Sequence, residues 1–491
     1  MKFFKQQLPV LYYLLLTAII LQACAKQKGK LNHGDYPSEI GTIIANKCAT
    51  SGCHNSKSSI ASNNYNLESW DLMFKGSNSG SPVIPYNSAY SSLCFYINTF
   101  DDLGLKNAPT MPLNSNALSY NEVKLIKSWI DDGAPNINGE IKWQSPTNKK
   151  LYAVNQGCDV LTIFDSETQL PTRVISVGTK AGPDTPHNVK VSNDGKYFYV
   201  IFINNNVMQK FSTTDNSLIA NIPLSPLAAG TGTADAYDWN TFTITKDNKK
   251  AFCVSWQSAG VVACVDLENH KLIHYVGGLF NPHGIALTND EKNIYITAQM
   301  GNCLFQFDTA FTVSNKYTLD GLPANEFSNT IDSHEIILGK NPNEMIITCQ
   351  QSNDIRVFNT LTNSVTTIIP SSPAPLELIY SAQNNAYFIT HSEDTISFAN
   401  TRGSITKLNA SNYSMSKLKC GYQPHGLAVD NKTNLLYILS RNRNSNGPAP
   451  HHTSNCVGRN GFVNFINAQT FTLLNKKYEM SVDPYMIFAQ P

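Results

Sequence analysis

The sequence predicts a multidomain protein in which a small all-α domain precedes a larger all-β domain. Before about residue 137, apolar residues recur at helical spacing, as at Val123, Ile126 and Ile130. From about residue 148, short runs rich in Val, Ile, Tyr and Phe alternate with Asn, Asp, Gly and Lys turns, a pattern typical of strands. The chain of 491 residues also exceeds the length of one ordinary domain.

The chain begins with the features of an export signal. Lys2 and Lys5 precede an apolar stretch over residues 8–21, which is shorter than a typical membrane span and suits a signal peptide. Leu21-Gln22-Ala23-Cys24 follows and resembles a bacterial lipobox. This resemblance implies cleavage after Ala23 and a lipid on Cys24. The alternative is ordinary secretory cleavage near Ala23, with no role for Cys24.

We therefore expect residues 1–23 to be a signal peptide and residues 24–35 to be a linker. The mature chain would be lipid-anchored in the cell envelope and would contact the membrane through this lipid. Ala25 follows Cys24 without an acidic cluster nearby, which favours the outer membrane with the protein facing the periplasm.

Residues 48–54 read Cys-Ala-Thr-Ser-Gly-Cys-His. Two cysteines ending in Cys-His are the attachment signature of a c-type haem, because each thiol forms a thioether and the histidine binds the iron. Four residues rather than two separate Cys48 from Cys53, a spacing that occurs in some multihaem cytochromes. The alternative is a Cys48–Cys53 disulfide beside a surface histidine, His54.

Met111, in the segment Ala-Pro-Thr-Met-Pro, is the candidate second axial ligand, since His/Met ligation favours reduced iron and raises the potential. The segment Tyr120–Ile130 has helical spacing, and Gly133 and Pro135 end it. With these features, residues 36–137 resemble a small monohaem cytochrome c domain. The resemblance implies electron transfer through a haem c held by four residues: Cys48, Cys53, His54 and Met111.

The β-rich part of the chain repeats. The sixteen-residue segment His187–Phe202 aligns without gaps with five later segments: Asn240–Ser255, His283–Ala298, His334–Cys349, Leu376–His391 and His425–Ser440. The copies recur at intervals of about 40–50 residues, which is the period of propeller blades. Each copy supplies two strands of a blade, and two further strands follow, such as Val207–Thr213 and Leu218–Leu224.

The two ends of this region are expected to share one blade. Pro484–Ala489 matches the start of the repeat, and Lys150–Asn155, Val160–Asp165 and Thr172–Val177 supply the other three strands. Such closure removes exposed sheet edges. Residues 148–491 therefore resemble the YVTN-type seven-bladed β-propellers. The resemblance predicts the fold but no particular activity.

Histidine occupies the first position of four copies, as His187, His283, His334 and His425. In a propeller these positions lie on one face near the axis, and His391, at the end of its copy, falls there too. Neutral imidazoles from different blades suit a transition metal, copper above all, so a second metal site at these five histidines is one interpretation of the sequence. The alternative is that Pro-His-Gly is a recurring structural motif of such propellers, in which the histidine fills the channel mouth and forms a hydrogen bond with a neighbouring backbone.

Composition narrows the class of partners and the compartment. The formal net charge is +1 and no basic stripe stands out, so we expect no binding to nucleic acid. Eleven cysteines agree with an oxidising compartment. Cross-strand pairing of Cys253 with Cys264 and a Cys158–Cys456 bridge across the ring closure are both open to this sequence.

Two functions follow from these observations. In the first, the haem passes electrons to or from a site on the histidine face of the propeller. A small-molecule substrate or a redox partner protein would bind at that site, and the chain would be a periplasmic oxidoreductase. In the second, the propeller is a non-catalytic binding or docking module and the haem shuttles electrons for another complex.

Overall fold

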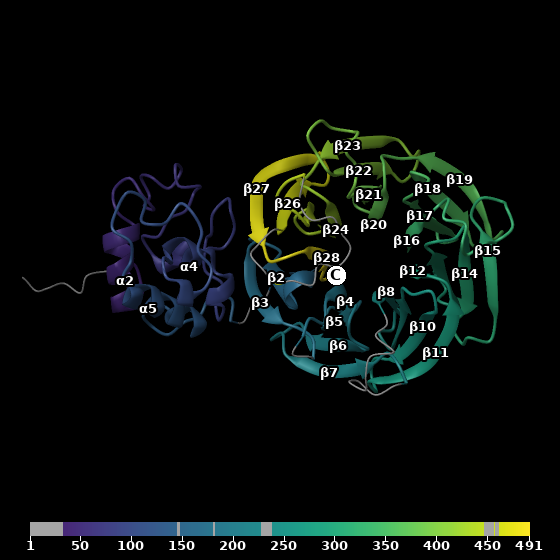
Figure 1. Cartoon of the computed structure of the whole chain (residues 1–491), viewed down its shortest axis with the longest axis horizontal. Coiled ribbons are helices and arrows are strands. Elements are labelled where there is room, and N and C mark those ends of the chain that lie inside the picture. The colour runs from purple at the N-terminus through teal and green to yellow at the C-terminus, as the bar shows by residue number, and fades with distance from the viewer. Residues whose placement is uncertain (1–32, 145–147, 180–181, 227–237, 446–455, 457–460) are drawn as a thin grey trace, which may run out of the picture.

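The computed structural model describes residues 33–144, 148–179, 182–226, 238–445, 456 and 461–491. Figure 1 shows a ring of sheets with a smaller body of helices and loops beside it. The predicted signal peptide, the lipid-anchor residue Cys24, most of the predicted linker and His451-His452 lie outside the described residues. Within the described ranges, no helix combines the length and the apolar character needed to cross a membrane.

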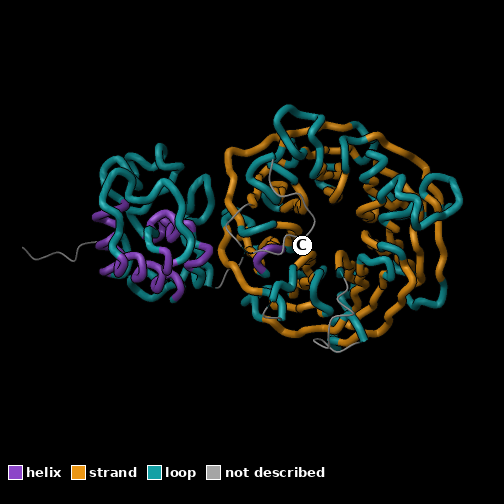
Figure 2. The backbone as a smooth tube through the Cα atoms, viewed as in Figure 1, coloured by secondary structure: helices purple, strands orange, loops and turns teal. Residues whose placement is uncertain are grey.

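Seven four-stranded antiparallel sheets form the ring, which confirms the predicted seven-bladed propeller (Figure 2). Six sheets follow the chain in order, from the innermost strand outward: β4–β7 (Pro186–Val191, Tyr197–Phe202, Val207–Ser212, Leu218–Pro223), β8–β11 (Trp239–Ile244, Lys250–Ser255, Gly260–Asp266, Lys271–Leu279), β12–β15 (Pro282–Leu287, Asn293–Ala298, Cys303–Asp308, Ser314–Thr318), β16–β19 (Ser333–Leu338, Glu344–Cys349, Asp354–Asn359, Ser364–Pro370), β20–β23 (Pro375–Ser381, Ala386–His391, Ser404–Asn409, Met415–Lys419) and β24–β27 (Pro424–Asp430, Leu435–Ser440, Gly461–Asn467, Thr472–Met480).

The seventh sheet joins the two ends of the propeller sequence, as predicted. Its strands are β28 (Pro484–Ala489), β1 (Lys150–Asn155), β2 (Val160–Asp165) and β3 (Pro171–Ser176). Leu151 of β1 lies opposite Ala489 of β28. The innermost strand β28 also contacts both β4 and β24, so the ring of inner strands is closed.

Apolar side chains fill the space between adjacent blades. In one example, Tyr152 of β1 stacks on Phe198 of β5, which stacks in turn on Phe211 of β6, at centroid distances of 4.3 and 4.8 Å. Successive side chains of a strand point to opposite faces of its sheet, so they pack alternately against the blade on one side and the blade on the other. Each blade is therefore held by the blades on both sides rather than by one central core.

The Cys253–Cys264 bridge that the sequence left open does not form in the structure, and the reason is the strand register. Cys253 of β9 lies opposite Ala263 of β10, and Cys264 lies opposite Phe252. The two cysteines are therefore one position out of register and project from opposite faces of the sheet, where both are buried free thiols. The structure does contain the Cys158–Cys456 disulfide, which links the closing blade to the long connection after β25.

The residues before the ring contain most of the described helices: α2 (Ser38–Ile43), the π-helical turn η1 (Ile44–Cys48), α3 (Trp70–Met73), η2 (Ser88–Tyr90), α4 (Ser92–Ile97), η3 (Asp101–Leu103) and α5 (Tyr120–Asp131). We call residues 33–144 the N-terminal body. Its helices are few and mostly short, loops make up much of it, and an all-α domain of the predicted kind is not evident.

The predicted closing helix is present as α5. Ser119 and Glu122 form a capping box at its start, and Val123, Ile126, Trp129 and Ile130 are buried along one side. These side chains pack with residues of α2, α3 and α4 in one hydrophobic cluster. The cluster supports the loops that carry the candidate site.

The N-terminal body lies against the closing blade (Figure 1). The Arg173 guanidinium on β3 donates to the Trp143 carbonyl at 3.0 Å and lies over the Tyr86 ring at 5.3 Å. The Asn87 side-chain amide donates to the Val174 carbonyl at 3.2 Å. These contacts create a seam between the N-terminal body and the ring.

Candidate functional site

The four predicted haem ligands line one cavity of about 460 Å³ in the N-terminal body. Cys48 ends η1 and is buried, Cys53 and His54 follow in the next loop, and Met111 comes from the loop after η3. Pockets for small molecules and cofactors commonly have volumes of about 300–1,000 Å³. The fold therefore places a short motif and a distant methionine on the walls of one cavity of suitable size.

Backbone hydrogen bonds turn the cysteine segment back on itself. The His54 N–H donates to the Cys48 carbonyl and the Cys53 N–H donates to the Thr50 carbonyl, each at 3.1 Å. The Asn55 side-chain oxygen then accepts from the Lys57 N–H at 3.0 Å. The unusually long spacing between the cysteines is thus taken up by a hydrogen-bonded turn, and both thiols still reach the cavity wall.

Neither Cys48 nor Cys53 forms a disulfide in the structure. The structure of the described residues therefore does not contain the Cys48–Cys53 bridge of the alternative interpretation. Burial, with a smaller contribution from the nearby Cys53, raises the pKa of the Cys48 thiol to about 12. Both cysteines are free in the structure, and a free cysteine is what thioether attachment requires.

His54 presents a neutral imidazole at the cavity wall. Burial lowers the pKa of His54, while the backbone of Tyr65 acts in the opposite direction. The Tyr65 ring packs edge-on against the imidazole, with ring centroids 5.0 Å apart. The neutral form is the one that binds a metal ion. The Met111 N–H donates to the Tyr96 carbonyl at 2.7 Å, which ties the methionine loop to α4.

These four side chains supply two thiols, one imidazole and one thioether, which is the donor set of a c-type haem with His/Met ligation. The residues present therefore fit the group that the motif implies.

Sequence reasoning missed several residues of this cavity, including Ser79, Ser92 and Tyr96. Tyr96 lies on α4 together with Leu93 and Ile97, which also line the cavity. The spacing of these three residues is that of one helix face and was visible in the sequence. Ser79 lies in a loop, where no periodic pattern marks a residue that will face a ligand.

The histidines at the first repeat position gather near the axis, together with Tyr485 of β28. Their rings form a continuous series in which neighbouring centroids are 4.3 Å apart for His187 and Tyr485, 3.7 Å for Tyr485 and His425, 6.5 Å for His425 and His334, and 3.9 Å for His334 and His283. All five side chains are buried. We call this series the histidine arc.

Two members of the histidine arc hydrogen-bond protein groups. His283 Nδ1 lies 3.0 Å from the His334 carbonyl, and His187 Nδ1 lies 2.6 Å from the Gln156 side-chain nitrogen. His391 lies apart from the ring contacts of the arc: its nitrogens pair with the Pro373 carbonyl and the Thr406 hydroxyl. The hydrogen bond from His283 to the backbone of a neighbouring blade agrees with the alternative interpretation, in which these histidines fill the channel and bind no metal.

Across the described residues, no group of three or more His, Cys, Asp or Glu side chains has an arrangement that suits a metal ion. The second metal site therefore stays a prediction from the sequence.

Buried ionisable residues lie beside the histidine arc in the axial channel, and the sequence analysis did not single them out. Glu377 Oε1 is 4.0 Å from His334 Nδ1 and 3.9 Å from His425 Nδ1. Burial, together with the neighbouring Glu335, raises the pKa of Glu377, and burial raises the pKa of Glu335 to about 7 although Lys190 opposes it. Glu335, Glu377 and Lys190 line a channel cavity of about 390 Å³.

A sequence signal for these carboxyl groups did exist. The second position of the repeat is glycine in two copies, as Gly284 and Gly426. In two other copies the same position is glutamate, as Glu335 and Glu377. Glycine there allows close approach to the neighbouring inner strand. A glutamate in its place marks a blade whose inner strand presents a carboxyl group to the channel.

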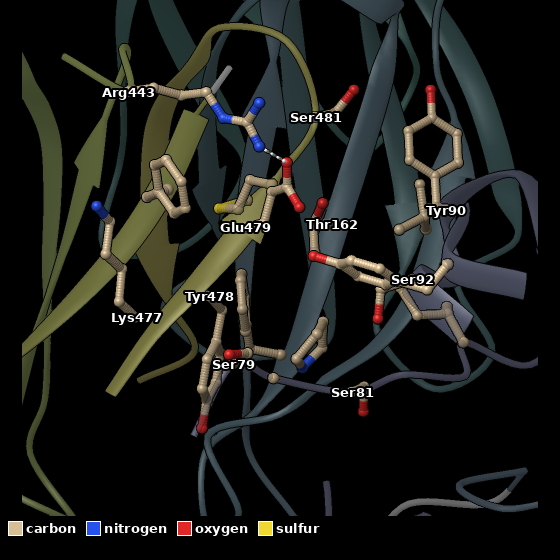
Figure 3. A pocket seen from close by; sticks show the side chains of 18 residues that line it. Ser79, Ser81, Tyr90, Ser92, Thr162, Arg443, Lys477, Tyr478, Glu479 and Ser481 are labelled. Atoms are coloured by element: carbon tan, nitrogen blue, oxygen red, sulfur yellow. Dashed lines mark hydrogen bonds and ion pairs between the residues drawn. The ribbon is translucent and has the colours of Figure 1, made fainter. Parts of the chain in front are cut away.

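A further pocket of about 210 Å³ lies at the seam between the N-terminal body and the ring (Figure 3). Ser81 and Tyr90 come from the N-terminal body, whereas Thr162, Tyr478 and Ser481 come from the ring. We call it the seam pocket. Ser79, Ser92 and Tyr96 line both the seam pocket and the cavity of the predicted haem ligands.

The chain matches no family model and no curated protein sequence. One similar solved structure is a functionally unknown protein from Desulfotomaculum acetoxidans, with 12% identity, a TM-score of 0.49, and coverage of 69% of this chain and 100% of that chain. Another is the hydrazine synthase of Kuenenia stuttgartiensis, with 13% identity, a TM-score of 0.46, and coverage of 63% and 89%.

Proposed function

We propose that this chain is a c-type cytochrome anchored in the cell envelope, which carries one covalently attached haem in its N-terminal body and transfers electrons to or from a partner. The single observation behind this proposal is that Cys48, Cys53, His54 and Met111 line the same cavity. A disulfide or a surface histidine would give no reason for a distant thioether to share that wall. The partner is a redox protein or a small-molecule substrate.

When bound, a haem supplies one-electron chemistry. The thiols of Cys48 and Cys53 would anchor it, and the imidazole of His54 and the thioether of Met111 would bind its iron. Leu67, Leu93 and Ile97 give the cavity an apolar wall. An apolar wall limits water at the site, and solvent exclusion is one of the factors that set a reduction potential.

The propeller has a supporting role in this proposal. Its closed ring offers a rigid platform, and the hydrogen bonds of His187 and His283 favour docking over catalysis at the histidine arc. The second candidate, catalysis at a copper site on that face, requires a metal in addition to iron. A lipid on Cys24 would hold the chain at the outer membrane, facing the periplasm.

Covalent haem attachment is the direct test. The full chain, produced in a host that exports it and attaches haem, should keep its colour on a denaturing gel, and the Cys48→Ala/Cys53→Ala variant should lose it. Cys94→Ala is the matched control, because Cys94 is also a buried free thiol of the N-terminal body but does not line the cavity. A colourless wild-type chain with both thiols free would refute the proposal.

Elemental analysis separates the two roles of the propeller. Iron alone in the purified protein supports docking, whereas iron with stoichiometric copper supports a second redox centre. The copper should then be lost in a His283→Ala/His334→Ala variant while the haem absorbance stays.

A further inference from the structure

The channel cavity of about 390 Å³ is lined by residues of all seven innermost strands, which surround the axis in Figure 1. Near the starts of these strands lie Glu335 and Glu377, which are 7% and 5% exposed. Beyond the ends of the strands lie Lys246 and Glu291, in the turns after β8 and β12, and Lys246 is exposed. The channel cavity therefore runs from two buried carboxyl groups to the protein surface.

Glu377 has a buried carboxyl group that forms no hydrogen bond with another described residue. Its Oε1 atom lies 3.9 Å from His425 Nδ1 and 4.0 Å from His334 Nδ1, beyond hydrogen-bond distance. Its oxygens are not among the sealed, unpaired atoms of the described residues, so the group keeps accessible surface at the cavity that it lines. Glu335 Oε1 accepts from the Ile336 N–H at 3.0 Å, and its other oxygen is open in the same way. Buried polar groups are normally paired, so these two carboxyl groups point to a ligand that pairs with them.

The two carboxyl groups share one lysine. Lys190 lines the same end of the channel cavity, and its ammonium group interacts electrostatically with both carboxyl groups. Three further titratable groups face Glu377: His334, His425 and Tyr485. Burial, together with Glu335, raises the pKa of Glu377, and burial raises the pKa of Glu335 to about 7. At neutral pH a proton therefore takes the place of a second positive charge.

Between its two ends the channel cavity has a largely apolar wall. Ile337, Ile379 and Met486 line it from three different blades, and all three are partly exposed. Carboxylates bind an ammonium group through charge-assisted hydrogen bonds, and apolar surface favours a hydrocarbon chain. The volume of the cavity is in the range of small-molecule pockets. We propose that the channel cavity binds a short primary alkylammonium ion, with its ammonium group at Glu335 and Glu377 and its carbon chain along the apolar wall.

Calorimetric titration of the full chain with butylammonium chloride at pH 7 tests the binding, with butanol and potassium chloride as comparison ligands. Butylammonium should bind more tightly than either, since butanol lacks the charge and potassium lacks the chain. Propylammonium should bind about fourfold more weakly than butylammonium, the effect of one buried methylene group. Equal affinity for butanol and butylammonium would overturn the proposal, and so would equal affinity for potassium and butylammonium.

Two variants locate the binding. Glu377→Gln keeps the shape of the side chain but removes its charge, so it should weaken butylammonium binding by roughly ten- to a hundredfold, the usual effect of a hydrogen bond to a charged group. Thr243→Trp places a large ring at a partly exposed position of β8 that lines the cavity between its two ends, and it should abolish binding. Wild-type affinity in either variant would contradict the proposal.

Glu344→Gln is the matched control for the loss of a carboxylate. Glu344 begins β17, the strand next to the innermost strand β16, and it does not line the channel cavity. This variant should bind butylammonium as the wild type does. A loss of affinity as large as that of Glu377→Gln would show that the ligand responds to the charge of the ring as a whole, and it would overturn the assignment to the channel cavity.

Proton release gives a readout that depends on the carboxyl groups themselves. When the ammonium group arrives, Glu377 gives up its proton to the solvent, so the heat of binding should differ between phosphate and Tris buffers, which take up a proton with different heats. Equal heats in the two buffers would overturn the role of Glu377.

The inference does not depend on the proposed function, because the channel cavity belongs to the ring and the predicted haem ligands belong to the N-terminal body. A neutral amine can also bind a haem iron, so the titration is repeated on the Cys48→Ala/Cys53→Ala variant. Retained affinity in that colourless chain supports the channel cavity whatever the fate of the haem. Loss of binding there would place the ligand in the N-terminal body and would overturn the assignment.

Discussion

The N-terminal body and the propeller both carry histidines that the sequence marks as ligands, but the two regions use them differently. In the N-terminal body, His54 shares a cavity with two thiols and a thioether. In the propeller, His187, His283, His334 and His425 stack into the histidine arc, where His187 and His283 hydrogen-bond protein groups. In the N-terminal body chemically different donors meet at one cavity, whereas in the propeller one residue type recurs because the architecture repeats.

The difference has a physical basis. The repeat places the same position of every blade at the same height near the axis, so any residue favoured there by packing will appear to converge. Nothing in the N-terminal body imposes such symmetry. Met111 and Cys48 come from segments far apart in the sequence, and no repeat accounts for their meeting at one cavity wall.

The first and largest contrast to test is a pair of histidine-to-alanine variants. His54→Ala should abolish the normal haem absorbance, because it would remove the imidazole that we propose as an iron ligand. His425→Ala should leave that absorbance unchanged and lower stability by about 1–3 kcal/mol, since it removes a buried ring that packs 3.7 Å from Tyr485. Visible spectra and thermal unfolding of the two variants measure both effects. A changed haem spectrum in His425→Ala would mean that the histidine arc affects the environment of the haem.

A pair of methionine-to-leucine variants sharpens the same contrast. Met111→Leu keeps the volume but removes the thioether, so the reduction potential should fall by an appreciable share of the roughly 0.8 V that axial ligands span. Met345→Leu is the control, because Met345 is buried between blades of the propeller. This substitution should lower the free energy of unfolding by less than about 1.5 kcal/mol and should leave the reduction potential unchanged. Redox titration followed at the haem bands distinguishes them. An unchanged potential in Met111→Leu would remove Met111 from the ligand set.

The ring has its own covalent link, the disulfide between Cys158 and Cys456, which spans a sequence separation of 298. Replacing both cysteines with serine should lower the stability of the propeller by about 2–4 kcal/mol, because a long loop in the unfolded chain is no longer closed. The haem spectrum should not change. Urea unfolding followed by circular dichroism gives the loss. A reductant should shift the wild type and leave the variant unaffected, and an equal shift in both would argue against the bridge.

Much of the ring was predictable because its pattern is repeated and local. The predicted strands Lys150–Asn155 and Pro484–Ala489 coincide with β1 and β28, and their pairing followed from the need to close the ring. The free state of Cys253 and Cys264 was not predictable, since a shift of one residue in strand register moves a side chain to the other face.

The candidate site was predictable only in part, and for a different reason. Cys48, Cys53 and His54 form a contiguous motif, and Met111 stands out by its chemistry. Tyr96 and Ser79 carry no such signal, because their place on the cavity wall depends on how loops pack over α4. The seam pocket depends on the docking of two regions far apart in sequence, which no local pattern encodes.

The smallest effect to test concerns His391, the one predicted propeller ligand that lies apart from the ring contacts of the histidine arc. Burial lowers the pKa of His391 to about 4, from the usual value near 6.5. As the pH falls from about 6.5 to 4, the unfolded chain binds a proton that the folded chain does not, so stability falls by up to about 3 kcal/mol. Above about 6.5 this histidine makes no pH-dependent contribution. The difference in urea midpoint between the wild type and His391→Gln should therefore be constant at neutral pH and should shift against the wild type below it. A difference in urea midpoint that stayed constant down to pH 4.5 would mean that His391 takes up a proton in the folded state as readily as in the unfolded state. That behaviour is expected of a solvated histidine at the channel mouth and not of one buried inside its own blade.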